Sequence, residues 1–205
     1  MSALGRDTRL GDAPDRFDIV AIAASAGGVQ ALIAVLGALR ADFPVPVLVV
    51  QHLDPRHDTT LAVILDRRCA LRVKLAESGE RIASGTVYVA PPDHHLLVGA
   101  DGVLTLSDRE RTQWVRPAAD LLFESVAESY GPRAVVCVLT GTGRDGAHGV
   151  DVVKAHGGTV IVENPETADF TGMPHAAVDT GKADLVLPLS EIPAAVHDLV
   201  GARLS

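Results

Sequence analysis

The chain has 205 residues and a formal net charge of -8, and 47% of its residues are hydrophobic but only 3% are aromatic. This length and composition fit one α/β domain with an aliphatic core. They argue against a nucleic-acid-binding protein, which normally presents a basic face and stacking aromatic rings. No apolar run is long enough to span a bilayer, and residues 1–16 lack the apolar segment of a signal peptide. We therefore expect a cytoplasmic protein with a disordered tail over residues 1–16 and one folded domain over residues 17–205.

Strands and helices are predicted to alternate along the chain. Apolar runs and alternating patterns predict strands, in chain order, at 17–24, 45–50, 71–75, 86–90, 95–98, 103–106, 134–139, 158–162 and 183–189. Helical spacing predicts helices at 29–39, 61–65 (capped by Asp58), 117–128 (with Pro117 at the first helical position), 146–156, 176–180 and 190–204. The glycines at 99 and 102 predict that strands 95–98 and 103–106 form an antiparallel hairpin. The order predicts a doubly wound, mainly parallel sheet in a three-layer α/β/α arrangement, with one hairpin appended.

The first strand, turn and helix carry one polar side chain at a revealing place. Ser25 stands between the apolar run 17–24 and the helical pattern that begins at Val29, and Gly27 and Gly28 follow it. A serine on such a turn is held at the mouth of the sheet, and the glycines allow close backbone approach. The first helical N–H groups point at whatever lies over the turn. The turn therefore presents either a nucleophile with an oxyanion site beside it or a loop that holds a phosphate.

Three polar residues follow predicted strands that could meet at one edge of the sheet. Ser25 follows the first strand, His52 follows the second, and Asp145 lies in the glycine-rich loop after strand 134–139. In an open parallel sheet the carboxyl ends of the strands line the ligand crevice. A serine needs a base to become a nucleophile, a histidine is the usual base, and a carboxylate orients the imidazole. The sequence thus offers a nucleophile, a base and an orienting group.

Each of these residues also has a structural interpretation. Ser25 could be a small residue in a phosphate-binding turn, although the turn lacks G-x-G-x-x-G and His52 stands where a dinucleotide site would place a ribose-binding acid. His52 could be an ordinary hydrogen-bonded histidine, with His57 as its nearest competitor for the role of base. Asp145 could be the N-cap of the helix that follows it.

The sequence offers little support for a metal, a cofactor or a disulfide. Cys69 and Cys137 have neither C-x-x-C nor zinc-site spacing, and Cys137 lies in an apolar run, as a buried small hydrophobe would. A disulfide between them is not expected in the cytoplasm. The triplet 93–95 (Asp-His-His) permits a metal site, but adjacent residues at a strand start point to opposite faces. We expect no metal and no cofactor.

Six motifs occur in order and together resemble one family. They are 25–28 (SAGG), His52, 88–92 (YVAPP), 116–123 (RPAADLLF), 139–146 (LTGTGRDG) and 171–174 (TGMP). Over residues 17–200 the chain resembles the catalytic domain of the CheB-type chemotaxis methylesterases. The resemblance implies a serine hydrolase that removes methyl groups from glutamate γ-methyl esters on the cytoplasmic helices of chemoreceptors, and many members also deamidate receptor glutamines. Family members often carry an N-terminal receiver domain, and we expect this chain to be a stand-alone catalytic domain.

The resemblance assigns the catalytic roles to Ser25, His52 and Asp145. Backbone N–H groups near Ala26 and in the loop that holds Thr142 would then bind the oxyanion. The enteric pattern has threonine and methionine where this chain has Ala26 and Thr142. Both changes resemble the branch in which the esterase is fused to, or works beside, a receptor methyltransferase, which is the second partner implied. The alternatives are a non-catalytic module that binds an anion or nucleotide, and an esterase or amidase that acts on another protein.

Overall fold

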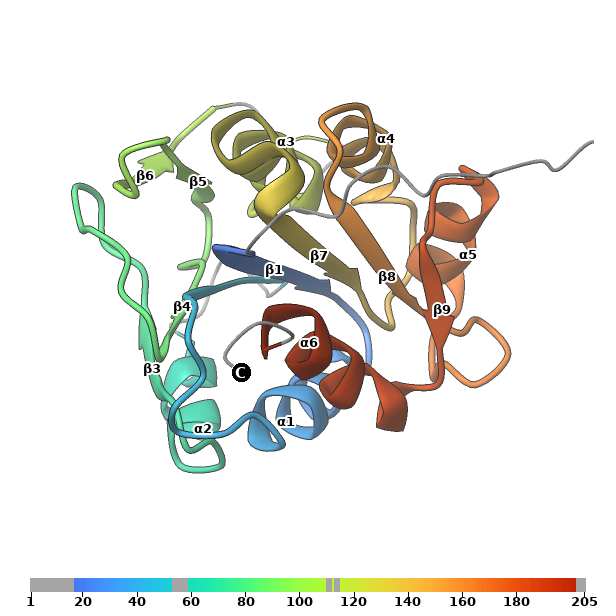
Figure 1. Cartoon of the computed structure of the whole chain (residues 1–205), viewed down its shortest axis with the longest axis horizontal. Coiled ribbons are helices and arrows are strands. Elements are labelled where there is room, and N and C mark those ends of the chain that lie inside the picture. Colours follow the sequence, from blue (N-terminus) through green and yellow to red (C-terminus); the bar gives the residue numbers. More distant parts are fainter. Residues whose placement is uncertain (1–16, 53–58, 110–111, 113–114, 202–205) are drawn as a thin grey trace, which may run out of the picture.

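The central feature of the fold is a seven-stranded parallel sheet between two layers of helices (Figure 1). The computed structural model describes residues 17–52, 59–109, 112 and 115–201. The sheet contains, in spatial order, β3 (Arg72–Leu75), β4 (Thr86–Val89), β2 (Val47–Gln51), β1 (Ile19–Ala24), β7 (Ala134–Val138), β8 (Thr159–Glu163) and β9 (Leu185–Leu187). A separate antiparallel hairpin joins β5 (His95–Val98) to β6 (Leu104–Ser107).

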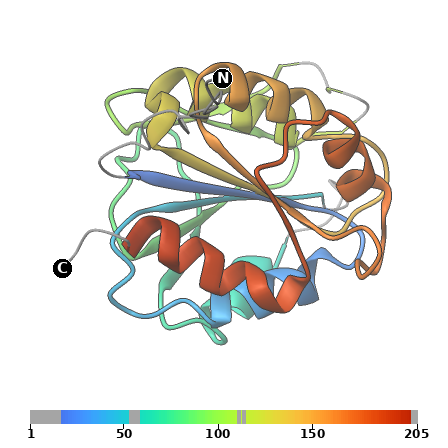
Figure 2. The ribbon, with the colours of Figure 1, turned by 45° about the vertical axis from the view of Figure 1, so that its right-hand side comes forward.

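Both faces of the sheet are covered, which explains why its central strands are apolar throughout. Every residue of β1, β2 and β7 is buried, as expected for parallel strands covered by helices on both sides. One face packs against α1 (Gly28–Gly37), α2 (Leu61–Asp66) and α6 (Ile192–Gly201). The other packs against α3 (Ala119–Tyr130), α4 (Ala147–Ala155), α5 (Gly172–Asp179) and the hairpin. Figure 2 shows these three layers, with the sheet between the helices. No helix in the described part of the chain has the length and apolar character needed to cross a membrane.

The chain changes direction across the sheet between β1 and β7. These two strands are neighbours in the sheet, yet the chain leaves β1 through α1 on one face and leaves β7 through α4 on the other. Connections that diverge in this way open a crevice beyond the strand ends, where ligands bind in open α/β sheets. Residues that follow β1, β2 and β7 therefore lie close together at one edge of the sheet.

The predicted fold class and hairpin are confirmed, whereas three helix starts differ from the prediction. Pro117 precedes α3, which begins at Ala119, because a remote carboxylate binds the first N–H groups of that helix. α5 begins at Gly172 rather than at residue 176, since a proline is tolerated in a first turn. α6 begins at Ile192 because Ser190 lies in a preceding 3₁₀ turn. The predictions for residues 1–16, Asp58 and residue 204 lie outside the described residues.

Candidate active site

Ser25 lies on a tight turn whose backbone is fully engaged. Its N–H donates to the Thr140 carbonyl at 3.0 Å, and its carbonyl accepts the Gly28 N–H at 2.8 Å. Gly27 adopts a φ of 75°, which glycine reaches at little cost. A Cβ at Gly27 would also come within 3.2 Å of the Phe170 ring. The glycines predicted to shape this turn are therefore required both by backbone conformation and by close approach.

Gln51, the last residue of β2, connects the Ser25 turn to His52. Its buried side-chain Nε2 donates to the Ser25 carbonyl at 2.8 Å and to the His52 carbonyl at 3.0 Å. Two carbonyl partners require the nitrogen to face them, so the amide orientation is fixed. The buried Gln51 Oε1 has no hydrogen-bond partner among the described residues, and it would lie 2.0 Å from a Cβ at Gly28. A buried unpartnered oxygen lowers the stability of the protein. The Gln51 side chain therefore joins the Ser25 turn to His52 at some cost in stability.

His52 and Asp145 form a hydrogen-bonded pair that is largely shielded from solvent. His52 Nε2 lies 2.7 Å from Asp145 Oδ2, and the two side chains are 13% and 3% exposed. The same carboxylate accepts the N–H groups of Ala119 at 2.6 Å and Asp120 at 3.1 Å. These two bonds and the contact with His52 hold the Asp145 carboxylate in place at the start of α3. Asp145 therefore binds the first turn of α3, and the N-cap position of α4 belongs to Gly146 instead.

The structure brings Ser25 and His52 to neighbouring strand ends without joining their side chains. The residues before them, Ala24 and Gln51, are paired in the register of β1 and β2, and the His52 N–H donates to the Ala24 carbonyl at 3.2 Å. Ser25 Oγ makes no hydrogen bond to any described residue, so the expected Ser25–His52 bond is absent. Because Asp145 engages Nε2, the ring nitrogen left for Ser25 is Nδ1. Catalytic hydrogen bonds often tighten only when substrate is bound.

The loop after β7 lies directly against Ser25. A Cβ at Gly141 would come within 2.8 Å of Ser25 Cβ, so only glycine permits this approach. The Gly141 N–H is already bonded to the Phe170 carbonyl at 3.0 Å. The N–H groups of Ala26 and Thr142 make no hydrogen bond within the described part of the chain. Their proposed role as oxyanion donors stays a prediction, and Gly141 is not a candidate for it.

A buried glutamate supports the start of this loop. Glu163, at the end of β8, is 2% exposed, and its Oε2 accepts the Thr140 N–H at 2.7 Å. Burial raises the pKa of Glu163, while the bond from Thr140 acts in the opposite direction. Thr140 also accepts the Ser25 N–H through its carbonyl. Glu163 is therefore connected to the Ser25 turn through a single residue, Thr140.

Asp120 is a further buried carboxylate beside Asp145. It is 2% exposed, and its Oδ1 accepts the N–H groups of Gly146 at 2.9 Å and Gly149 at 2.8 Å. Burial raises the pKa of Asp120; the backbone bonds lower it, and the charge of Asp145 raises it further. Sequence reasoning missed both this residue and Gln51. Asp120 stands inside the family-like motif 116–123, but nothing in that motif shows that its side chain reaches another helix.

The other candidates do not join this site. In the triplet 93–95, Asp93 pairs with Arg116 at 2.7 Å, His94 bonds the Pro92 carbonyl, and the buried His95 accepts the Ala118 N–H through Nδ1. Among the described residues, the three side chains contact different partners. Among the described residues, no three His, Cys, Asp or Glu side chains gather so as to hold a metal ion. His57 lies outside the described residues.

Both cysteines are free thiols. Burial raises the pKa of Cys69 to about 11, with the charge of Asp66 as a second cause, and burial raises the pKa of Cys137 to about 12. Thiols with such pKa values are almost wholly protonated at neutral pH and are poor nucleophiles. Neither cysteine competes with Ser25 for the role of nucleophile.

Comparison with known proteins decides the family. The family model described as CheB methylesterase matches residues 20–196. The chain belongs to the CheB methylesterase family. It is 41% identical to the crystal structure of the Thermotoga maritima CheB methylesterase catalytic domain, with a TM-score of 0.86 over 90% of this chain and 99% of that one. The match confirms the predicted fold and enzyme class, a methylesterase-family hydrolase.

Several curated relatives show the same relationship at different lengths. A Leptospira interrogans protein is 39% identical over 176 residues, which are 86% of this chain and 91% of the relative. The chain is 42% identical to the protein-glutamate methylesterase FrzG of Myxococcus xanthus and covers 56% of it. It is 40% identical to a protein-glutamate methylesterase/protein-glutamine glutaminase of Thermotoga maritima and covers 54% of it. The chain thus spans about half the length of these last two CheB-family relatives.

Proposed function

We propose that this chain hydrolyses glutamate γ-methyl esters of chemoreceptors with Ser25 as nucleophile, His52 as base and Asp145 as orienting carboxylate. The observation that carries the proposal is the buried His52–Asp145 pair at 2.7 Å, beside the turn that presents Ser25. A neutral imidazole that donates one N–H to a carboxylate presents its other nitrogen as a base. Family membership supports the same reaction class.

The proposed mechanism follows from which ring nitrogen is occupied. Because His52 Nε2–H donates to Asp145, His52 Nδ1 takes the proton from Ser25 Oγ as the oxygen attacks the ester carbonyl. The roles of the two nitrogens are the reverse of those in chymotrypsin-type triads, where Nδ1 faces the aspartate. Backbone N–H groups of Ala26 and Thr142 bind the oxyanion, and one such donor is typically worth ~3 kcal/mol.

The acyl-enzyme is formed and resolved by two proton transfers through His52. The imidazolium gives its proton to the methoxy oxygen, and methanol leaves. Water then attacks the glutamyl ester of Ser25 while His52 takes a proton from it. Collapse of the second intermediate returns that proton to Ser25 and releases a glutamate side chain. A side-chain amide would follow the same route with ammonia as the leaving group, which is the glutaminase reaction named for the Thermotoga maritima relative.

The partners we propose are the methylated cytoplasmic helices of a chemoreceptor and a receptor methyltransferase that supplies the ester, in the cytoplasm. Support comes from the family and from the methylesterase names of the relatives. The alternative of an anion-binding module is weaker, because two N–H groups expected to form its cradle are occupied. Gly28 N–H donates to the Ser25 carbonyl and Gly141 N–H to the Phe170 carbonyl.

The test is methanol release from methylated receptor by the Ser25→Ala variant. We expect release to be lost and labelling by a serine-reactive phosphonate to disappear, while the thermal unfolding midpoint stays close to wild type. Ser190→Ala, which removes a hydroxyl from an exposed position in the 3₁₀ turn after the edge strand β9, three strands from β1, serves as the matched control and should keep full activity. Undiminished methanol release from Ser25→Ala would refute the proposal.

A further inference from the structure

We infer that Asp120 is a positioning residue that holds Asp145 in place and puts a second negative charge behind the His52–Asp145 pair. The inference rests on the proposed function, because it gives Asp120 a part in the same reaction. Asp120 touches neither His52 nor Ser25 through any described hydrogen bond. It acts through Asp145, and the argument therefore depends on how the two carboxylates are connected.

The starts of α3 and α4 exchange carboxylates. Asp145, in the loop before α4, accepts the N–H groups of Ala119 and Asp120 at the start of α3. Asp120, in the first turn of α3, accepts the N–H groups of Gly146 and Gly149 at the start of α4. The Gly146 N–H belongs to the peptide bond that follows Asp145. Asp120 therefore fixes the backbone of Asp145 directly, while Asp145 fixes that of Asp120.

This exchange depends on a close approach of the two helices. A Cβ at Gly149 would come within 2.7 Å of Phe123 Cβ and 3.2 Å of Asp120 Cα, so α4 meets α3 at a position without a side chain. The N-cap residue of α4 is Gly146, at a φ of 94° and with no side chain to cap its helix. The orphan N–H groups at the start of α4 consequently need an acceptor from elsewhere. Asp120 supplies it.

Helix capping alone does not explain why this acceptor is charged. An asparagine oxygen would also accept two N–H groups, whereas a second carboxylate has to be buried next to the first. Burial and the charge of Asp145 both raise the pKa of Asp120, whereas the N–H groups of Gly146 and Gly149 lower it. Buried like charges are costly unless a cation compensates them. The imidazolium that forms on His52 during the reaction is such a cation.

Other charged groups of the described part of the chain also act on Asp120. The charge of His148 on α4 lowers the pKa of Asp120. Glu124 lies one turn further along α3, and its Oε1 is 3.4 Å from His148 Nε2. His95 of β5 accepts a backbone N–H at the start of α3. Glu124 is the natural control, because its carboxylate is also on α3 and also faces His148, but makes no hydrogen bond to the described residues of the Asp145 loop. Its replacement removes the same charge without the same contacts.

The experiment compares Asp120→Asn with Glu124→Gln in full pH profiles of kcat and kcat/KM for methanol release, and of the phosphonate labelling rate of Ser25. We expect Asp120→Asn to lower kcat by roughly tenfold or more with little change in KM, since the group acts on the imidazolium rather than on substrate binding. We expect the acid limb of its profile to move down by roughly half a pH unit, because a nearby negative charge has gone. Glu124→Gln should leave the acid limb within ~0.2 units of wild type.

The outcomes separate this inference from the proposed function. If the wild type neither releases methanol nor takes up the phosphonate, both fall. If the wild type reacts, and Asp120→Asn matches it in kcat and in the position of the acid limb, only the inference falls. A fall in kcat with an unmoved acid limb would show a merely structural residue and would also overturn it. Should Asp120→Asn fail to fold, Asp120→Ser keeps a hydroxyl acceptor without the charge and is judged by the same two measurements.

Discussion

Replacement of Gln51 by methionine should separate the stability of this enzyme from its activity. The perturbation removes an amide of similar length and leaves an unbranched apolar side chain in a buried position. In the native protein, Gln51 Nε2 bonds the carbonyls of Ser25 and His52, while Gln51 Oε1 is buried without a described partner. The variant loses the two bonds and also loses the unpartnered oxygen.

The magnitude follows from these opposing terms. Two hydrogen bonds at ~1 kcal/mol each are lost, whereas relief of a buried unpartnered oxygen returns ~1–3 kcal/mol. Both carbonyls lose their bond from Gln51, but the Ser25 carbonyl keeps its bond from Gly28, so only the His52 carbonyl is left without a donor among the described residues. We therefore expect the free energy of unfolding to change by less than ~1 kcal/mol. We expect kcat to fall by roughly 10- to 100-fold, because small misplacements of reacting groups are costly.

The assay combines urea unfolding with methanol release and phosphonate labelling of Ser25. Gln51→Glu is the companion variant. It has the same shape but turns a carboxylate oxygen towards two carbonyl oxygens, so it should lose stability as well as activity. A Gln51→Met variant with wild-type kcat would refute the idea that Gln51 positions the two turns. A loss of more than ~3 kcal/mol of stability would refute the balance of hydrogen-bond terms.

Two further predictions concern the surroundings of the Ser25 turn. Burial raises the pKa of Glu163, so the stability that this residue contributes is fully present below the unfolded pKa of 4.5 and is lost as pH rises through the folded pKa. In urea unfolding experiments, Glu163→Gln should therefore gain stability relative to wild type as the pH rises from about 4 to about 7. A difference in stability that stays constant over this pH range would contradict the prediction. Phe170→Ala should raise KM for methylated receptor several-fold more than KM for a small glutamate methyl ester, because this ring is 44% exposed beside the turn. The control is Val186→Ala, which is 42% exposed on the edge strand β9, and an equal effect of both variants on receptor KM would contradict a specific contact.

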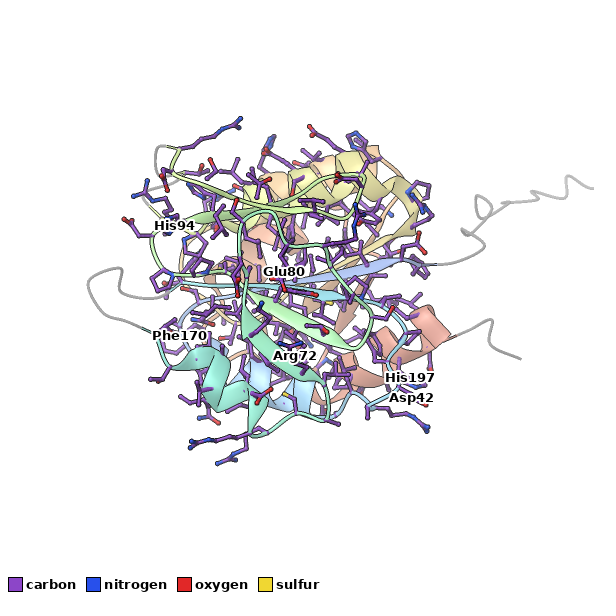
Figure 3. The ribbon with its side chains drawn as sticks, turned by 90° about the vertical axis from the view of Figure 1, so that its left-hand side faces the viewer. Asp42, Arg72, Glu80, His94, Phe170 and His197 are labelled. Atoms are coloured by element: carbon purple, nitrogen blue, oxygen red, sulfur yellow. The ribbon has the colours of Figure 1, made fainter. Side chains whose placement is uncertain are left out.

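The exposed side chains also distinguish the two ends of the sheet. Phe170 and His94 lie along one edge of the view in Figure 3, and Asp42 and His197 along the opposite edge. Phe170 lies against the Ser25 turn, so its edge of the view is the one on which the Ser25 turn lies. We expect a large substrate that reaches Ser25 to pass close to Phe170. This is why Phe170, rather than the equally exposed Val186, is the residue chosen to test substrate contact.

The sequence predicts those features of the site that depend on local strand and helix patterns. The apolar run of β1 and the helical spacing after it locate Ser25 at a strand end, and the same reasoning locates His52 and Asp145. Gln51 and Asp120 escaped because their roles depend on which remote backbone groups they reach. Gln51 is 26 residues from the Ser25 carbonyl it bonds. No local pattern contains that partner.

The start of α3 is another feature that depends on a remote residue and that the local sequence does not predict. A proline at position 117 is a sound local signal for a first helical position, yet the helix begins at Ala119. The N–H groups there are bound by Asp145, 26 residues further along the chain. The residue that was assigned to catalysis also sets the helix boundary. A method that treats helix starts and catalytic residues separately would miss this connection.

The two halves of the candidate triad are organised by different means. His52 and Asp145 are joined side chain to side chain, and Asp145 is held by two N–H groups of α3. Ser25 is held through its backbone alone, by Thr140, Gly28 and Gln51, while its hydroxyl makes no bond to a described residue. The His52–Asp145 pair is therefore formed in advance, and in the proposed mechanism the Ser25 hydroxyl still has to meet His52 Nδ1. An already oriented base lowers the cost of that step, because its position does not have to be fixed when substrate binds.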